Sequence, residues 1–180
     1  MSSISDIALV TRARVLRDDR AFARLVDKYQ AAVRRFFLSQ TLGDEPLSDD
    51  LAQDTFVKAY VCLGQFRGTA RFSTWLYRIA YNVYCDHVRR QRPTADVDTV
   101  AATRPDGSVR DTSLRLDLYD ALRRLGEAER TCITLQLIDG YSIDKISGIT
   151  GMAQGTVKSH LSRGKAKMAL FLKQNGYDGK

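Results

Sequence analysis

Cysteine and histidine are scarce: the 180 residues include three cysteines and two histidines. Cys62, Cys85 and Cys132 are far apart in the sequence, form no CxxC pair, and each lies among apolar or aromatic neighbours. This distribution is a poor match to a disulfide framework or a metal site, and it favours buried, reduced thiols. His87 and His160 are also far apart and lie in helical patterns beside basic residues, where surface polar roles are favoured over ligation. We therefore expect no metal ion and no cofactor.

Long apolar runs are absent as well. No window approaches the roughly 20 apolar residues that a membrane-spanning helix needs. Charged residues interrupt the short apolar pieces near the N-terminus, which is therefore unlike a signal peptide. These residues are Asp6, Arg12, Arg14 and Arg17. We expect a cytoplasmic protein.

Basic residues outnumber acidic ones, with 28 Lys and Arg against 21 Asp and Glu, for a formal net charge of +7. This excess favours an anionic partner. Nucleic acid is the obvious candidate, although composition alone does not separate it from an anionic membrane surface. The hydrophobic share of 44% excludes wholesale disorder, so the chain is expected to fold.

No convincing strand pattern and no repeat of fixed period is present, whereas apolar residues recur at helical spacing through most of the chain. In residues 93–113 large apolar side chains are few, and Asp, Thr, Pro, Gly and Ser are abundant. That composition is typical of a linker. The sequence therefore predicts an all-α fold of two small helical domains, residues 1–92 and 114–180, joined by a flexible linker at 93–113.

A loop is predicted over residues 42–47, because Gly43 and Pro46 each interrupt the helical pattern there. Ser48 is then the expected cap of a helix over residues 49–65. The outer face of its first turns is acidic and amidic, with Asp49, Asp50, Gln53 and Asp54. Neighbouring aspartates suit a helix N-terminus, and no nearby histidine, lysine or glycine-rich loop completes a catalytic group. A protein-binding face and a solvated helix start remain as the two interpretations.

The next predicted loop, residues 66–72, brings together two phenylalanines, two arginines and a glycine. Exposed aromatic rings beside cations bind unstacked bases. The alternative is that Phe66 and Phe72 close the hydrophobic core at the two ends of the loop. A helix then runs from a cap at Ser73 or Thr74 to about Arg92. It carries more aromatic and basic residues than a core requires, which makes nucleic-acid stacking a serious possibility.

The stretch Tyr141–Lys173 has the pattern of two helices joined by a tight turn. Gly151 separates two apolar-periodic runs, and glycine readily takes the positive φ that such a corner requires. Ser142 is the expected N-cap of the first helix, and Gly140 is expected to end the helix before it. The second helix has an apolar inner face and an outer face that carries Lys158, Ser159, Ser162, Arg163 and Lys165.

That outer face offers donors to phosphate oxygens and to the acceptor edge of guanine in the major groove. An ordinary solvated amphipathic helix is the competing interpretation. The turn glycine and the capped preceding helix favour a DNA-binding helix-turn-helix over it.

Four segments match one known family in their order and separation. They are LVDKYQAAVRRFF, DDLAQDTFVKAY, FRGTARFSTWLYRIAYNVYCDHVRR and LRRLGEAERTCITLQLIDGYSIDKISGITGMAQGTVKSHLSRGKAKM. Each motif is weak singly, but together they cover nearly the whole chain. On these segments the chain resembles the extracytoplasmic-function (ECF) sigma factors, the compact two-domain class of bacterial transcription initiation subunits.

The resemblance implies that the chain binds core RNA polymerase, directs it to specific promoters and has no small-molecule substrate. The acidic helix start would dock on the clamp coiled coil of the largest polymerase subunit. The implied contact residues are Asp49, Asp50, Gln53, Asp54 and Phe56. The flap region of the polymerase and an anti-sigma factor are further implied partners.

The resemblance also divides the DNA contacts between the domains. The N-terminal domain would recognise and melt the −10 element and capture a flipped base. Its implied contact residues are Arg67, Gly68, Thr69, Arg71, Phe72, Trp75, Arg78 and Asn82. The second helix of the helix-turn-helix would read the −35 element, and the linker would run towards the active site and RNA exit path of the polymerase.

Two other classes of protein compete with this interpretation. A stand-alone helix-turn-helix regulator would need an N-terminal sensing domain, but the helical pattern before Pro93 shows no βαβ signal for one. A nucleic-acid enzyme that holds a metal on Asp49, Asp50 and Asp54 would need ligands converging from elsewhere in the chain, and none are evident.

Overall fold

The structure is a computed structural model that describes residues 2–91 and 117–176. The predicted linker at 93–113 lies outside the described residues. The described chain is helical, without strands. Its elements are α1 (Ser2–Val15), α2 (Asp19–Gln40), α3 (Glu45–Val61), the 3-10 turn η1 (Leu63–Gln65), α4 (Phe72–Gln91), α6 (Glu127–Ile133), the π-helical turn η2 (Thr134–Ile138), α7 (Ile143–Thr150) and α8 (Gln154–Gln174). Residues 117–123 are also helical. None of the described helices is both long and apolar enough to cross a membrane.

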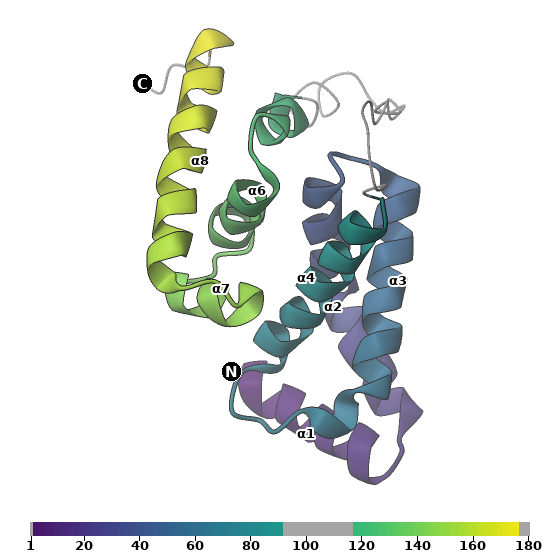
Figure 1. Ribbon diagram of the computed structural model, residues 1–180. Helices are drawn as coiled ribbons and strands as arrows, with labels where there is room; N and C mark the ends of the chain where they lie inside the picture. Colours follow the sequence, from purple (N-terminus) through teal and green to yellow (C-terminus); the bar gives the residue numbers. More distant parts are fainter. Residues whose placement is uncertain (1, 92–116, 177–180) are drawn as a thin grey trace.

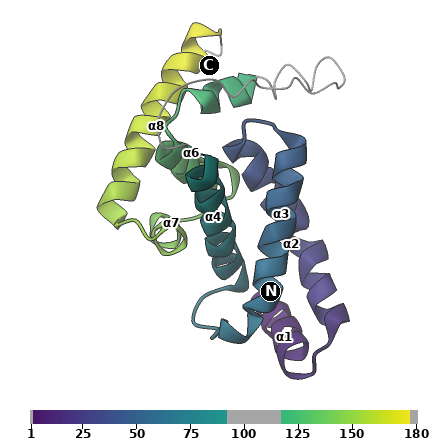
Figure 2. The ribbon, with the colours of Figure 1, turned by 45° about the vertical axis from the view of Figure 1, so that its right-hand side comes forward.

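The helices form two groups that lie side by side (Figure 1). Helices α1–α4 make up the N-terminal group, and the helices from Asp117 onward make up the C-terminal group. In both Figure 1 and Figure 2, α4 is the member of the N-terminal group that faces α6 and α7. Helix α8 lies on the outer side of the C-terminal group, where most of its length faces solvent.

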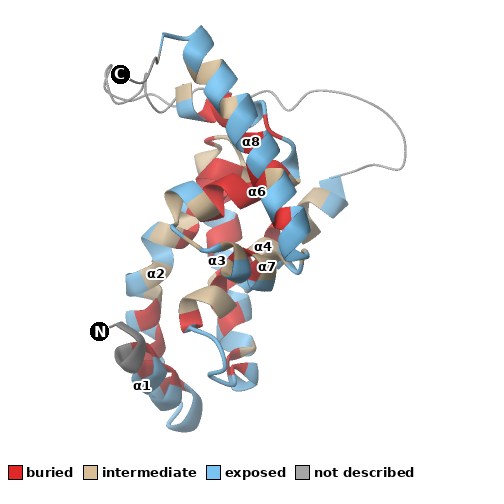
Figure 3. Ribbon diagram, turned by 90° about the vertical axis from the view of Figure 1, so that its left-hand side faces the viewer, coloured by how far each residue is buried: buried red, intermediate tan, exposed pale blue. Residues whose placement is uncertain are grey.

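The core of the N-terminal group is built from the apolar faces of α2, α3 and α4. Phe36, Leu25 and Leu76 are fully buried there. Helix α2 begins with its backbone N–H groups satisfied, because the carboxylate of Asp18 accepts from the N–H groups of Arg20 and Ala21. Figure 3 shows that buried positions continue through α4 into α6, so the two groups share one hydrophobic interior.

Helix α3 begins earlier than the sequence predicts. Its N-cap is Asp44, whose carboxylate accepts from the N–H of Leu47 at 3.0 Å, and Pro46 occupies the first turn. Proline is tolerated there because its missing N–H would have no helical partner. The predicted cap, Ser48, is instead fully buried inside the helix and donates to the carbonyl of Asp44 at 2.6 Å. The predicted loop over residues 42–47 was therefore wrong from residue 45 onward, and the predicted cap at Ser48 was wrong.

Two aromatic residues of α4 pack between the groups, and both belong to the aromatic excess from which the sequence suggested nucleic-acid stacking. Tyr77 is buried, and its ring lies 5.1 Å from that of Tyr141 just before α7. Tyr84 is also buried, and its hydroxyl donates to the carbonyl of Gln40 at 3.5 Å. The excess of aromatic residues on this helix therefore serves, in part, a second packing surface that periodicity within one domain does not reveal.

Gly164 of α8 packs tightly against Ile133 of α6, and this contact generates a stability prediction. A Cβ added to Gly164 would lie 2.7 Å from Cγ1 of Ile133. We expect Gly164→Ala to lower the free energy of unfolding by about 1–3 kcal/mol through overpacking. Gly155→Ala on the same helix is the matched control: a Cβ there meets nothing within 4 Å, and alanine favours helix by about 1 kcal/mol. Urea denaturation of both variants measures the difference, and equal stabilities would contradict this packing.

Candidate functional site

The predicted helix-turn-helix is present as α7 and α8, and each expected turn signal has the expected geometry. Ser142 caps α7 by accepting from the N–H of Lys145 at 3.5 Å. Gly151 ends α7 in the left-handed conformation, with φ of 76°, and Gly140 has φ of 72°. The hydroxyl of Ser147 donates to the carbonyl of Met152 at 2.6 Å and so ties the first helix to the far side of the turn. The corner between the helices is thus closed by backbone geometry and one side chain.

The outer face of α8 presents its polar residues to solvent. Val157 and Leu161 are buried against the rest of the group. The five predicted contact residues are exposed: Lys158, Ser159, Ser162, Arg163 and Lys165. Residues 158, 162 and 165 follow the i, i+4, i+7 spacing that aligns side chains along one face of a helix. A row of donors therefore faces outward on a helix whose opposite side is anchored.

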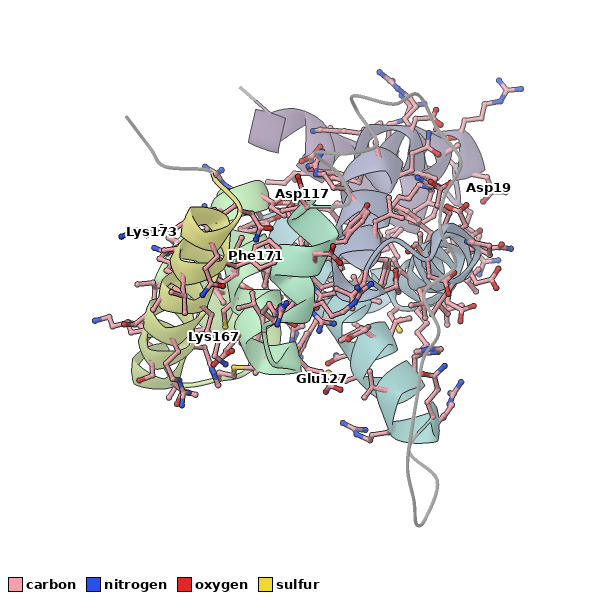
Figure 4. The ribbon with its side chains drawn as sticks, turned by 90° about the horizontal axis from the view of Figure 1, so that it is seen from above. Asp19, Asp117, Glu127, Lys167, Phe171 and Lys173 are labelled. Carbon is pink, nitrogen blue, oxygen red and sulfur yellow. The ribbon has the colours of Figure 1, made fainter. Side chains whose placement is uncertain are left out.

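Glu129 of α6 anchors this helix from behind. Its Oε2 accepts from Lys167 Nζ at 2.7 Å and from the N–H of Gly126 at 3.1 Å, and its Oε1 lies 3.8 Å from Arg163 Nε. The Lys167 ammonium and the Gly126 N–H hold the pKa of Glu129 below its ordinary value of 4.5. Figure 4 looks down on this packing, with Lys167 and Phe171 labelled on α8 beside the helices of the C-terminal group. Arg163 therefore belongs both to the outer face and to an internal ion-pair cluster.

The loop between η1 and α4 is exposed, but its phenylalanines are not. Phe66 and Phe72 are 5% and 2% exposed, and their rings pack 5.8 Å apart and within 5.5 Å of the Trp75 ring. The alternative interpretation of the sequence, that both rings close the core, is therefore correct for burial. Phe72 is the first residue of α4, and its ring is buried. A buried ring is not free to stack on a base. Residues 67–71 are all exposed, and they include the predicted contacts Arg67, Gly68, Thr69 and Arg71.

A hollow beside this loop contains the other residues predicted for the −10 region. It has a volume of about 440 Å³ and receives Trp75, Arg78 and Asn82 from α4. The opposite wall consists of Lys58, Cys62 and Gln65, none of which was predicted from the sequence to belong to this site. Lys58 belongs to α3, the helix that precedes α4 in the chain, and Cys62 and Gln65 follow α3. Only the packing of α3 on α4 brings them to the hollow.

The acidic face of α3 adjoins a larger, mainly apolar groove between α2 and α3. Asp49, Asp50, Gln53 and Asp54 are exposed along the helix, and Phe56 is half-buried. The groove has a volume of about 740 Å³ and is lined by residues that include Phe22, Val26, Phe56, Val57, Tyr60 and Val61. At one end Arg34 Nε donates to Asp49 Oδ1 at 2.5 Å. Val57 and Val61 were not predicted as site residues. Their spacing of four residues is the sequence signal that could have found them, and in the structure they are 56% and 76% exposed.

Sequence comparison identifies the class of protein that this architecture defines. Residues 25–94 match the family model described as Sigma-70 region 2, and residues 115–168 match the model described as Sigma-70, region 4. The two matches fall on the two helical groups. They define the chain as a sigma factor of the sigma-70 type.

Full-length relatives give the family. The chain is 34% identical over 181 aligned residues to the ECF RNA polymerase sigma-E factor of Escherichia coli, which covers 90% of this chain and 91% of that protein. It is 32% identical over 163 residues to the ECF RNA polymerase sigma factor SigW of Bacillus subtilis, covering 82% and 87%. The chain belongs to the ECF family of RNA polymerase sigma factors, and it directs RNA polymerase to promoters.

Solved structures of similar fold contain a second protein. CnrH, in complex with the cytosolic domain of CnrY, matches 94% of this chain and 98% of its own with a TM-score of 0.72 and 27% identity. The sigma factor RpoE of Bartonella quintana, in complex with the anti-sigma factor NepR, matches 84% of this chain and 96% of its own with a TM-score of 0.69 and 26% identity. Both likenesses extend across the two helical groups.

The Glu129 cluster generates a pH prediction. A carboxyl with a lowered pKa in the folded state contributes stability that is present above its unfolded pKa and is lost as the pH falls through the folded pKa. We expect the melting temperature of the wild type to fall below about pH 4.5, and we expect Glu129→Gln to remove part of this dependence. Thermal unfolding from pH 3 to 7 is the measurement. Asp120→Asn is the control, because Asp120 forms an exposed pair with Arg123 of the same helix. If Glu129→Gln leaves the fall of the melting temperature at low pH unchanged, Glu129 is not its source.

Proposed function

We propose that the two helical groups bind the two promoter elements separately, with α1–α4 at the −10 element and the C-terminal group at the −35 element. The observation that carries the proposal is the outward row of donors at residues 158, 162 and 165, which follows a capped helix-turn-helix corner. A recognition helix enters the major groove with such a face, while the first helix crosses the DNA backbone. Lys158, Ser159, Ser162, Arg163 and Lys165 are the proposed −35 contacts.

The −10 element is proposed to be opened at the exposed loop and the hollow beside it. Arg67 and Arg71 supply positive charge for the DNA backbone. Gly68 and Thr69 have small side chains, which allow the DNA to approach the loop closely. A base leaving the stack needs an aromatic surface and hydrogen-bonding groups. Trp75, Arg78 and Asn82 supply these in a hollow of about 440 Å³. Phe72 contributes indirectly, because its buried ring packs against Trp75 at 5.5 Å and positions it.

Core polymerase is proposed to dock on α3 and its groove. A long apolar groove with acidic side chains along its rim suits an amphipathic helix that carries basic residues. The clamp coiled coil of the largest polymerase subunit is the proposed occupant. Asp50, Gln53 and Asp54 would contact its charged side, and Phe56 would lie with Val57 and Val61 against its apolar side. Asp49 is paired with Arg34, and this ion pair would lie at the end of the groove.

Other properties follow from the family. An anti-sigma factor is a proposed partner, since RpoE is bound by one in its structure. The flap region of the polymerase is the proposed contact of the C-terminal group, and residues 93–113 are the proposed linker between the groups. We expect the protein to act in the cytoplasm, where polymerase and promoters are present, as a binding subunit without catalytic residues.

Run-off transcription tests the proposal as a whole. Purified core polymerase, this chain and a library of genomic promoter fragments should yield transcripts whose mapped starts share two separated sequence elements. Core polymerase alone is the control. Starts that share no upstream elements would contradict the division of promoter contacts between the two groups.

A substitution on the recognition helix tests the −35 assignment. We expect Arg163→Ala to weaken −35-dependent promoter binding by about 1–3 kcal/mol and to relax sequence preference, whereas Lys158→Ala weakens binding to all sequences and lowers the salt slope by about one. Titration of holoenzyme onto promoter DNA at several salt concentrations distinguishes the two effects. Lys173→Ala at the far end of α8 is the control. Because Arg163 also approaches Glu129, its variant is first checked for an unchanged melting temperature at pH 7.

A charge reversal on α3 tests the polymerase-docking surface. We expect Asp54→Lys to weaken core binding by about tenfold, since an exposed acidic contact would become repulsive. Co-purification with core polymerase and its dependence on salt are measured. Asp120→Lys makes the same charge change on the C-terminal group and should leave core binding unchanged. Equal binding by wild type and Asp54→Lys would show that the acidic face does not contact core polymerase and is only a solvated helix start.

A further inference from the structure

Helix α1 lies across the end of the N-terminal group at which α4 begins (Figures 1 and 2). It contacts α2, α4 and η1, and it buries Leu9, Val10 and Ala13 against them. The match to Sigma-70 region 2 begins at residue 25, so α1 precedes the part of the chain that this family model covers. The role of α1 is therefore inferred from the residues that it contacts.

Residues 67–71, the exposed loop proposed to bind the −10 element, are held mainly at their two ends. None of their side chains forms a hydrogen bond with another described residue. Their backbone is tied at the far end, where the carbonyl of Arg71 accepts from the N–H of Trp75 at 3.2 Å. The flanking residues Phe66 and Phe72 are buried. The path of the loop therefore depends on how firmly these two residues are held.

Arg14 of α1 holds the start of the loop. Its Nη1 donates to the carbonyl of Phe66 at 3.1 Å. Because the peptide group is planar, a hydrogen bond to this carbonyl also fixes the direction in which the chain continues to Arg67. A guanidinium donor forms a stronger hydrogen bond than a neutral donor. Arg14 therefore positions the first residue of the loop without belonging to the loop.

The same helix holds the other end of the loop through Tyr29 of α2. The carboxylate of Asp6, a residue that is 6% exposed, accepts from the Tyr29 hydroxyl at 2.6 Å and from the Lys28 ammonium. A buried carboxylate is costly without its partners, so these contacts also fix α1 to α2. The Tyr29 ring lies 5.6 Å from the ring of Phe72, the first residue of α4. Movement of Tyr29 away from Phe72 would cost the hydrogen bond to Asp6.

The two ends of the loop meet at Trp75, the aromatic wall of the hollow proposed to receive a displaced base. The Phe66 ring lies 5.4 Å from the Trp75 ring, and the Phe72 ring lies 5.5 Å from it. The start of the loop, its end and Trp75 therefore belong to one aromatic cluster. Helix α1 contacts this cluster at Phe66 through Arg14, and at Phe72 through Tyr29.

From these contacts we propose that α1 is a brace for the −10 loop, and that Arg14 and Tyr29 are positioning residues for base capture. The brace holds residues 67–71 and Trp75 in place before DNA arrives, so that less conformational freedom is lost on binding. A supported site binds more tightly than the same residues on a mobile loop. Neither positioning residue has to touch DNA. The inference rests on the proposed function, because it concerns what positions the proposed −10 site.

Substitutions at Arg14 loosen the start of the loop. Arg14→Ala removes the donor to the Phe66 carbonyl. Arg14→Lys keeps the positive charge and a donor, and should restore part of the effect. Arg12→Ala is the matched control, because it removes the same charge from the same helix, whereas Arg12 pairs with Asp18 at 2.7 Å.

A substitution at Tyr29 loosens the end of the loop. Tyr29→Phe removes the hydroxyl that donates to Asp6 and keeps the ring beside Phe72. Tyr84→Phe is the matched control, because it removes a hydroxyl from a buried tyrosine that donates to the carbonyl of Gln40. Tyr84 lies 12 positions after Phe72, or about 18 Å further along α4.

Binding of holoenzyme to single-stranded −10 DNA is the measurement, with the sequence taken from the promoters mapped by run-off transcription. The intact strand is compared with strands that carry an abasic site at one position each. We expect wild-type holoenzyme to lose affinity when the captured base is missing. Arg14→Ala and Tyr29→Phe should bind the intact strand about threefold to tenfold more weakly, and should lose less affinity at that abasic position. Arg14→Lys should fall between Arg14→Ala and the wild type.

The two controls should match the wild type on every strand, and all variants should match it in affinity for core polymerase. Equal binding of the intact strand by the wild type and both brace variants would overturn the brace. So would an equal loss at the abasic position, because the brace and the captured base would then act independently. Failure of the proposed function is distinguishable, since it would appear as wild-type holoenzyme that loses affinity at no abasic position. That result would remove base capture and the positioning role with it.

Discussion

Helix α4 is packed on two sides, and the rest of the structure depends on this constraint. One face contributes Leu76, Ala80 and Val83 to the N-terminal core, and another places Tyr77 and Tyr84 against α2 and the C-terminal group. The remaining surface carries Trp75, Arg78 and Asn82 towards the hollow beside the loop. A helix held in this way can present a rigid surface to a displaced base, because burial on both flanks opposes any rotation about its axis.

The sequence was sufficient for the features that depend on local rules. Glycine at a positive φ, a serine cap and helical periodicity are local, so the helix-turn-helix at Tyr141–Lys173 was predicted from residues alone. The start of α3 was misplaced because Pro46 was assigned to a loop, although proline is tolerated in a first helical turn. The burial of Tyr77 depends on Tyr141, a neighbour distant in sequence that local rules do not reveal. The α3 wall of the hollow, and the hydrogen bonds that the buried Gln40 side chain makes with Thr131 and Thr134, have no local signal at all.

Charge and apolar surface are distributed in a way that fits several partners on one small chain. The acidic rim and apolar groove lie on α2 and α3, whereas the cationic row lies on α8 at the outer side of the other group. Separate modules can each bind weakly and still act together, since engagement of one raises the effective concentration of the other. That advantage exists only if the tether between the groups allows both sites to be reached.

The most direct measurement is a structure of this sigma factor with core RNA polymerase on a promoter whose −10 region is melted. The account predicts α8 in the major groove of the −35 element and the residue 67–71 loop at the opened −10 element. A complex in which α8 lies away from the −35 element, or the residue 67–71 loop lies away from the melted −10 region, would contradict it.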